Sequence, residues 1–202
     1  MRRNMLQRAA RLDYKEPTDG DIVALKDQVR IMNTHRLSVV SGVMAAFIMS
    51  AAVARAEDIS GTILRTLLLS EDTRLVGDVT CNVTAGPCIA FGAPGIALFL
   101  NGFSITGPGD PATGCGGTSV ATETGISTNG QRNIEVRGPG VVQRFRGDGI
   151  LFIASNKGRV ERVTTTTNCM SGIRVNPTSS EIRAEGNISV RNGHATNPCG
   201  GI

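Results

Sequence analysis

The 202-residue sequence lacks tryptophan and contains few other aromatic residues. It has one tyrosine and six phenylalanines, and after residue 56 only five phenylalanines remain. Clefts that bind sugars generally use Trp or Tyr rings as flat amphipathic surfaces for stacking. The scarcity of these rings therefore argues against a strong carbohydrate site, but it leaves room for a weak, polar one.

An excess of charge is also missing from most of the chain. The formal net charge is +4, yet residues 57–202 contain twelve Lys and Arg and twelve Asp and Glu. The excess belongs to residues 1–56, which contain nine basic and five acidic residues. Residues 57–202 therefore give no support for nucleic-acid binding, which uses a concentrated basic surface.

The basic segment has the pattern of an export signal. Residues 32–36 carry positive charge, residues 37–53 form an uncharged apolar run, and Ala54-Arg55-Ala56 follows. This order predicts a signal peptide over residues 32–56, cleaved after Ala56, and an exported protein, periplasmic or extracellular. An uncleaved helix that contacts the membrane is the alternative, although ~17 apolar residues is at the low end of spanning length.

Residues 1–31 lie upstream of this signal, and residues 21–32 have loosely helical apolar spacing. Two interpretations remain open: a cytoplasmic tail, or a start codon assigned too early, with Met32 as the true start. Because signals normally begin within a few residues of the N-terminus, we favour Met32.

Gly-Ile pairs recur in the remaining sequence, at residues 95, 125, 149, 172 and 201. Short β-branched runs lie between them, separated by Gly and Asn. Fixed periods of this size indicate stacked repeats, and these repeats contain only strand-like segments. The sequence therefore predicts a β-solenoid over residues 57–202. Because no polar capping segment follows Ile202, we expect either truncation at the C-terminus, which we favour, or a partner that covers the last edge.

Five cysteines follow the predicted signal, which is typical of disulfides in an oxidising compartment. Cys81 and Cys88 are separated by seven residues and predict a local bridge. Cys169 and Cys199 both precede Gly-Ile pairs, so alignment of those pairs would place them about 4.8 Å apart, within reach of a disulfide. Cys115 is then unpaired, or it competes for Cys169. A metal site is not expected, because residues 57–202 have one His and no Cys-x-x-Cys pair.

Residues 96–107, an apolar strand, an Asn-Gly corner and Ile-Thr-Gly, resemble the first coil of right-handed parallel β-helix proteins of the pectate-lyase-like superfamily. Residues 190–193 resemble later coils. The resemblance covers roughly residues 60–202. With the repeat period, it implies an all-β, right-handed, single-stranded parallel β-helix of about five or six coils. The N-terminal leader before it is expected to be helical from its own apolar spacing.

The resemblance points to an architecture rather than an activity, because the superfamily includes pectin-degrading lyases and hydrolases, epimerases, tailspikes and proteins without known chemistry. Lyases of the superfamily typically hold calcium with acidic residues and remove a proton with a basic one. Asp148, with Arg144 and Arg146 nearby, is the only candidate group of this kind, and it is weak because the acids are scattered and Arg is a poor base.

We therefore expect an exported repeat protein, without cofactor or catalysis, whose lateral face binds polysaccharide or protein weakly. The alternative is a fragment of a polysaccharide lyase, hydrolase or epimerase. Three acids on one face near Arg144 would favour the enzyme, whereas a flat face of mixed charge would favour the binding protein.

Overall fold

A computed structural model of the chain describes residues 56–115 and 120–194. The described part consists of β-strands and connecting turns, with one 3-10 helix, η1 (Pro111–Thr113). The expected leader, residues 1–31 and 32–55, lies outside the described residues. The first strand begins at Glu57, directly after the predicted cleavage position. The prediction of an all-β fold is confirmed for the described part.

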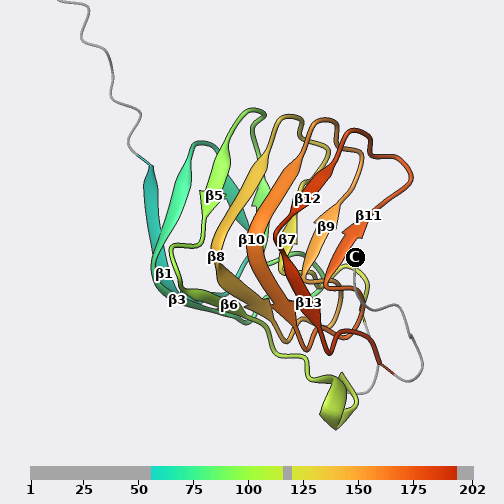
Figure 1. Cartoon of the computed structure of the whole chain (residues 1–202). Helices are drawn as coiled ribbons and strands as arrows, with labels where there is room; N and C mark the ends of the chain where they lie inside the picture. The colour runs from blue at the N-terminus through green and yellow to red at the C-terminus, as the bar shows by residue number, and fades with distance from the viewer. Residues whose placement is uncertain (1–55, 116–119, 195–202) are drawn as a thin grey trace, which may run out of the picture. The chain divides into compact units, whose positions relative to one another are not determined.

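The strands form two parallel sheets that run along the same stack, with the interior of the protein between them (Figure 1). Sheet 1 contains eight strands: β1 (Glu57–Ile63), β3 (Thr73–Cys81), β5 (Ala97–Phe99), β6 (Ser104–Thr106), β8 (Glu135–Gln143), β10 (Arg159–Thr166), β12 (Arg183–Glu185) and β13 (Ile188–Val190). Sheet 2 contains five strands: β2 (Leu67–Leu69), β4 (Ile89–Phe91), β7 (Ile126–Ser127), β9 (Ile150–Phe152) and β11 (Ile173–Val175).

The chain alternates between the sheets and returns to each one a single strand further along the stack. The order in sheet 1 is β1-β3-β5-β8-β10-β12, with β6 and β13 extending the rows of β5 and β12, and the order in sheet 2 is β2-β4-β7-β9-β11. Arg159 pairs with Glu135 and with Arg183, so a regular step is 24 residues. We call one passage through sheet 1 and then sheet 2 a layer.

Sheet 1 is bent along a line that crosses its strands. The register of β1 against β3 shifts at Gly61, and that of β10 against β8 shifts at Arg162. Both residues have positive φ, and so do Asn101 and Gly102 between β5 and β6. The expected corner at Asn101-Gly102 is therefore confirmed, and each regular layer has three strand segments.

The Gly-Ile repeat has a steric cause. Ile126, Ile150 and Ile173 pair in register on sheet 2 and are buried. A Cβ at Gly125 would lie 2.5 Å from the carbonyl oxygen of Gly149, and a Cβ at Gly149 would lie 2.6 Å from that of Gly172. Only glycine fits at this spacing. The repeat thus marks a column of close backbone contacts beside a column of isoleucines.

Gly95-Ile96 does not belong to this column, contrary to the sequence interpretation. Ile89 pairs with Ile126, so Cys88-Ile89 occupies the equivalent place. Gly95 instead lies at another corner, where it has a φ of 75° and donates its N–H to Arg132. Gly201-Ile202 lies outside the described residues.

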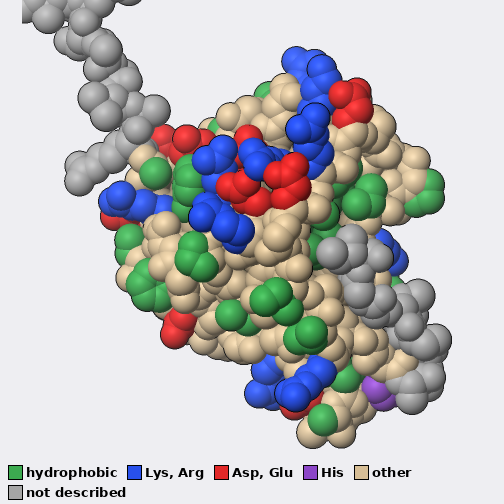
Figure 2. Space-filling model, in the orientation of Figure 1, with side chains coloured by type: hydrophobic (Ala, Val, Ile, Leu, Met, Phe, Trp, Pro, Cys, Tyr) green, Lys and Arg blue, Asp and Glu red, His purple; other side chains and the backbone are tan. Residues whose placement is uncertain are grey.

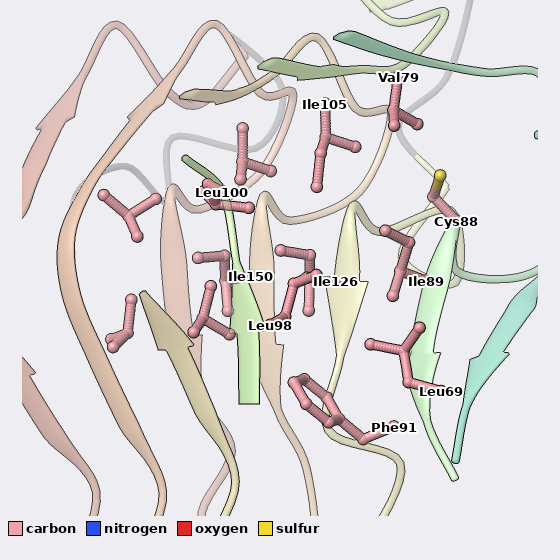
Figure 3. Close-up of a cluster of buried hydrophobic side chains, with 14 of the residues drawn as sticks. Leu69, Val79, Cys88, Ile89, Phe91, Leu98, Leu100, Ile105, Ile126 and Ile150 are labelled. Atoms are coloured by element: carbon pink, nitrogen blue, oxygen red, sulfur yellow. The ribbon is translucent and has the colours of Figure 1, made fainter. Parts of the chain in front are cut away.

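The interior between the sheets is filled by apolar side chains in rows. Figure 3 shows Leu69, Ile89, Leu98, Ile126 and Ile150 pointing into this space from both sheets, and each has 0% exposure. Close packing of such rows is the main source of stability in a fold of this kind.

Residues 107–125 interrupt the regular step and are fastened to the stack by a disulfide. Cys115 is bonded to Cys169, with Cα atoms 6.0 Å apart. The expected pairing of Cys169 with Cys199 is therefore wrong, because the long connection brings Cys115 back to Cys169. Cys199 lies outside the described residues. Cys81 is bonded to Cys88, as expected, with Cα atoms 5.9 Å apart.

Candidate functional site

The three candidate catalytic residues follow one another along the chain, but their described contacts differ. The guanidinium of Arg144 lies 3.4 Å from Asp110, at the start of η1. The Arg146 guanidinium lies 3.2 Å from the buried carboxylate of Glu123, and its Nε donates to the carbonyl of Cys115. Both arginines hold the connection of residues 107–125 against the stack.

Asp148 is fully buried and turns to a different partner, Arg174 on β11. Its Oδ1 accepts a 2.9 Å hydrogen bond from the backbone N–H of Ser171, and its Oδ2 lies 3.0 Å from the Nε of Arg174. Burial raises the pKa of Asp148, and the charge of Arg174 and the Ser171 hydrogen bond oppose this rise. The contacts of Arg144 and Arg146 given above are with Asp110, Glu123 and Cys115, whereas those of Asp148 are with Ser171 and Arg174.

A larger group of polar side chains lies on the outer face of sheet 1. The residues alternate inward and outward along each strand, and two outward rows run across the stack. One row contains Ala97, Glu135, Arg159 and Arg183, and the other contains Arg74, Phe99, Arg137, Glu161 and Glu185. We call these nine residues the charged face. Figure 2 shows the basic and acidic side chains gathered over β5, β8, β10 and β12.

Ion pairs connect these rows, with Glu161 at their centre. Arg159 lies 2.7 Å from both Glu161 and Glu185. Arg137 contacts Glu135 and lies 3.9 Å from Glu161. The pKa of Arg159 lies above its ordinary value, first because of its hydrogen bond to Glu185 and then because of neighbouring carboxylates. The positive and negative charges are thus interleaved, and no row carries one sign alone.

One aromatic ring belongs to the charged face. The guanidinium carbon of Arg137 lies 5.6 Å from the centre of the Phe99 ring, a cation–π distance. Phe99 also pairs with Arg74 and Arg137 across the sheet. The ring is therefore already in contact with arginine, and it offers a small apolar surface within a polar face.

Two hollows lie along the same edge of the charged face. One, of about 580 Å³, is lined by Lys157, Arg159, Glu181, Arg183 and Glu135. The other, of about 290 Å³, is lined by Asp72, Ala97, Phe99, Asn133 and Arg137, and it shares Glu135 with the first.

The floor of both hollows repeats along the stack because equivalent corners repeat. Gly95, Asn133, Lys157 and Glu181 all have positive φ, and each lies two residues before the strand that carries the charged face. Their N–H groups join successive layers: Gly95 donates to Arg132, Asn133 to Asn156, and Lys157 to Ser180. The two hollows therefore have the same backbone conformation in their floor, but different side chains line them.

The sequence contained a signal for this face. Glu135-x-Arg137, Arg159-x-Glu161 and Arg183-x-Glu185 recur at intervals of 24 residues. Acids scattered beside arginines are typical of a solvated outer face with weak ion pairs, and these residues do form ion pairs on the outer face of sheet 1. Their grouping into one ladder depends on the register of three strands.

Within residues 56–115 and 120–194, no group of three or more His, Cys, Asp and Glu side chains is arranged to hold a metal ion. In the same part of the chain, no helix is long and apolar enough to cross a membrane.

The charged face, with its balanced charges and two hollows, is the main candidate site. No family model matches the chain, and no curated protein or solved structure matches it significantly.

Proposed function

We propose that residues 57–202 form a right-handed, single-stranded parallel β-helix of the pectate-lyase-like type, in an exported protein. The parallel alternation between two sheets and the 24-residue step support the helix. Parallel strands joined by a crossover are right-handed in nearly all proteins, which supports the hand. The two disulfides are consistent with an oxidising compartment.

We propose further that this protein binds an extended polysaccharide weakly through the charged face and its two hollows, without cleaving it. The observation that carries this proposal is the row of hollows that share Glu135. Neighbouring strands lie about 4.8 Å apart, so successive layers present hydrogen-bonding groups at a regular spacing along the stack. Such a surface suits a polymer with repeating hydroxyl groups.

The charges support weak binding rather than catalysis. The three carboxylates of the charged face, Glu135, Glu161 and Glu185, each form an ion pair with Arg137 or Arg159. Exposed pairs of this kind exchange readily for hydrogen bonds to a ligand, because each contributes little to stability. The alternative, an enzyme fragment, requires converging acids, and the candidate group around Asp148 does not converge.

Affinity electrophoresis in gels that contain neutral or acidic polysaccharides tests this proposal on the purified protein. We expect retardation by at least one polysaccharide, and less retardation in Glu135→Ala and Arg183→Ala, which change the walls of the hollows. Arg65→Ala is the matched control, because Arg65 is exposed on the connection between β1 and β2.

Equal retardation of all variants would remove the charged face from the proposal. Retardation by no polysaccharide would reject polysaccharide binding. Release of new reducing or unsaturated chain ends during incubation would instead support the enzyme alternative.

A further inference from the structure

A third hollow lies on sheet 2, away from the charged face. It has a volume of about 400 Å³ and is bordered by the turn at residues 85–87, residues 121–124 and the strands β7, β9 and β11. Ser127, Leu151 and Arg174 face it from equivalent positions, because they pair in register across the three strands. We call it the Arg174 groove.

The walls of the Arg174 groove are mainly apolar. Ala85, Pro87, Ala121, Leu151 and Ile153 contribute to them, and Ile153 is one of the exposed large apolar residues. An apolar wall favours the burial of hydrocarbon, by about 25 cal/mol for each Å² removed from water.

One cationic side chain lies in this groove. Arg174 is about one-third exposed, and its ion-pair partner in the described part of the chain is Asp148. That contact uses Nε, whereas a guanidinium has five N–H donors in a planar fork. Its terminal N–H groups therefore remain able to bind a ligand, while Nε lies against Asp148.

Several buried polar atoms at this place have no hydrogen bond. Thr124, 1% exposed, lines the groove, and its hydroxyl has no partner among the described residues. The Nε of Arg174 and the Oδ2 of Asp148 are close together but not aligned as a hydrogen bond. Unsatisfied buried groups are rare in folded proteins, and a functional role or a bound water or ion is among the explanations for them.

We propose that the Arg174 groove binds a small organic molecule that has one carboxylate and an apolar body. A carboxylate matches the planar fork of Arg174 and accepts two hydrogen bonds from it. Leu151, Ile153 and Pro87 would contact the apolar body. Because the carboxylate of Asp148 already balances part of the charge of Arg174, a second negative charge on the ligand is repelled, and phosphate binds less well.

Isothermal titration of the full chain with sodium hexanoate, at constant ionic strength, tests this proposal. We expect saturable binding of hexanoate, and binding at least tenfold weaker for uncharged hexanamide and for inorganic phosphate, because a charged hydrogen bond is lost or repulsion is added. The variant Arg174→Gln is expected to lose affinity by about tenfold or more. Arg191→Gln, an exposed position that follows β13 on sheet 1, is the matched control and is expected to bind normally.

A second variant keeps the test valid if Arg174→Gln leaves Asp148 unpaired and the protein unfolds. The double variant Arg174→Gln with Asp148→Asn removes both charges and is expected to fold but not to bind hexanoate selectively over hexanamide. Asp148→Asn alone is expected to bind hexanoate more tightly, because Arg174 is then uncompensated.

Absence of saturable binding, equal binding of hexanoate and hexanamide, or unchanged affinity in the double variant would each overturn the proposal.

Discussion

The side chain of Asn168 donates a 3.0 Å hydrogen bond to Oδ1 of Asn192, which lies 24 residues later, in the next layer. The backbone N–H of Asn168 donates to the same oxygen, also at 3.0 Å. Asn168 is fully buried, and its own Oδ1 accepts from the N–H of Phe145 in the preceding layer. One asparagine thus connects three layers.

Replacement of Asn168 by Ala is expected to lower the free energy of unfolding by about 3 kcal/mol, because it leaves buried backbone groups without partners. Chemical denaturation measures the change. Asn176→Ala is the matched control, because the described hydrogen bonds to the Asn176 side chain come from Thr178 in a partly exposed turn, and we expect a loss below about 1 kcal/mol there. Equal losses would show that the ladder has no special role.

Two glycine substitutions separate crowding from backbone conformation. In Gly149→Ala, the new Cβ meets the Gly172 carbonyl at 2.6 Å and Nδ2 of Asn168 at 2.7 Å, and we expect destabilisation of about 3 kcal/mol. Gly130 has a φ of 79° and open space around its Cβ position, so Gly130→Ala is expected to cost about 1 kcal/mol. Thermal denaturation of both variants measures the difference. A larger effect at Gly130 would contradict the close contact between layers.

The stability of the protein is expected to depend on pH through Asp148. Burial raises the pKa of this carboxyl above its ordinary value of 3.8. Between that value and the higher folded value, the folded state holds a proton that the unfolded state has lost. The free energy of unfolding therefore falls as pH rises from about 4 through the folded pKa, and Asp148→Asn reduces this fall. Denaturation at a series of pH values measures both slopes.

Asp78 provides the control with opposite sign. Hydrogen bonds from the N–H and hydroxyl of Ser104 lower the pKa of Asp78. Its contribution is present above the ordinary pKa and is lost as pH falls, so Asp78→Asn is expected to reduce the loss of stability in acid. A change of the same sign in Asp78→Asn and Asp148→Asn would contradict this assignment.

The two disulfides are expected to contribute unequally. The Cys115–Cys169 bond closes a segment of 54 residues, and its removal by serine at both positions is expected to cost about 4 kcal/mol. The Cys81–Cys88 bond spans seven residues, and its removal is expected to cost about 2.5 kcal/mol. Denaturation of each double variant measures these losses.

Peptide mapping without reduction tests the pairing itself, and a peptide that contains a Cys169–Cys199 bond would contradict it.

The fold class was predictable because the sequence combines two periods: a long interval between equivalent isoleucines, and an alternation of inward and outward positions within each strand. Ile126, Ile150 and Ile173 recur at nearly equal intervals, and alternating inward and outward positions lie between them. The error at Gly95 has a physical origin. At Gly149, glycine is required because the backbone of the next layer lies too close for a side chain. At Gly95, glycine is favoured because the corner has a left-handed backbone conformation. The dipeptide Gly-Ile does not show which of these two reasons applies.

The sites were less predictable, because they depend on contacts between layers. The partner of Cys169 depends on how residues 107–125 return to the stack, which spacing alone does not determine. Arg174 appeared in the sequence as one arginine among many. Its contact with Asp148 and its place in a groove follow from the register of β9 and β11 and from the fold of residues 121–124.

The column of Gly125, Gly149 and Gly172 also bears on how such a chain can change in evolution. The regular layers pair in parallel at steps of 24 or 23 residues, so a duplicated or deleted segment of one full step is expected to restore a similar junction. Segments of other lengths would put a side chain where the next backbone must lie. We therefore expect insertions and deletions of whole steps to be tolerated better than partial ones, whereas residues 107–124, which lie outside the column, can accept other lengths.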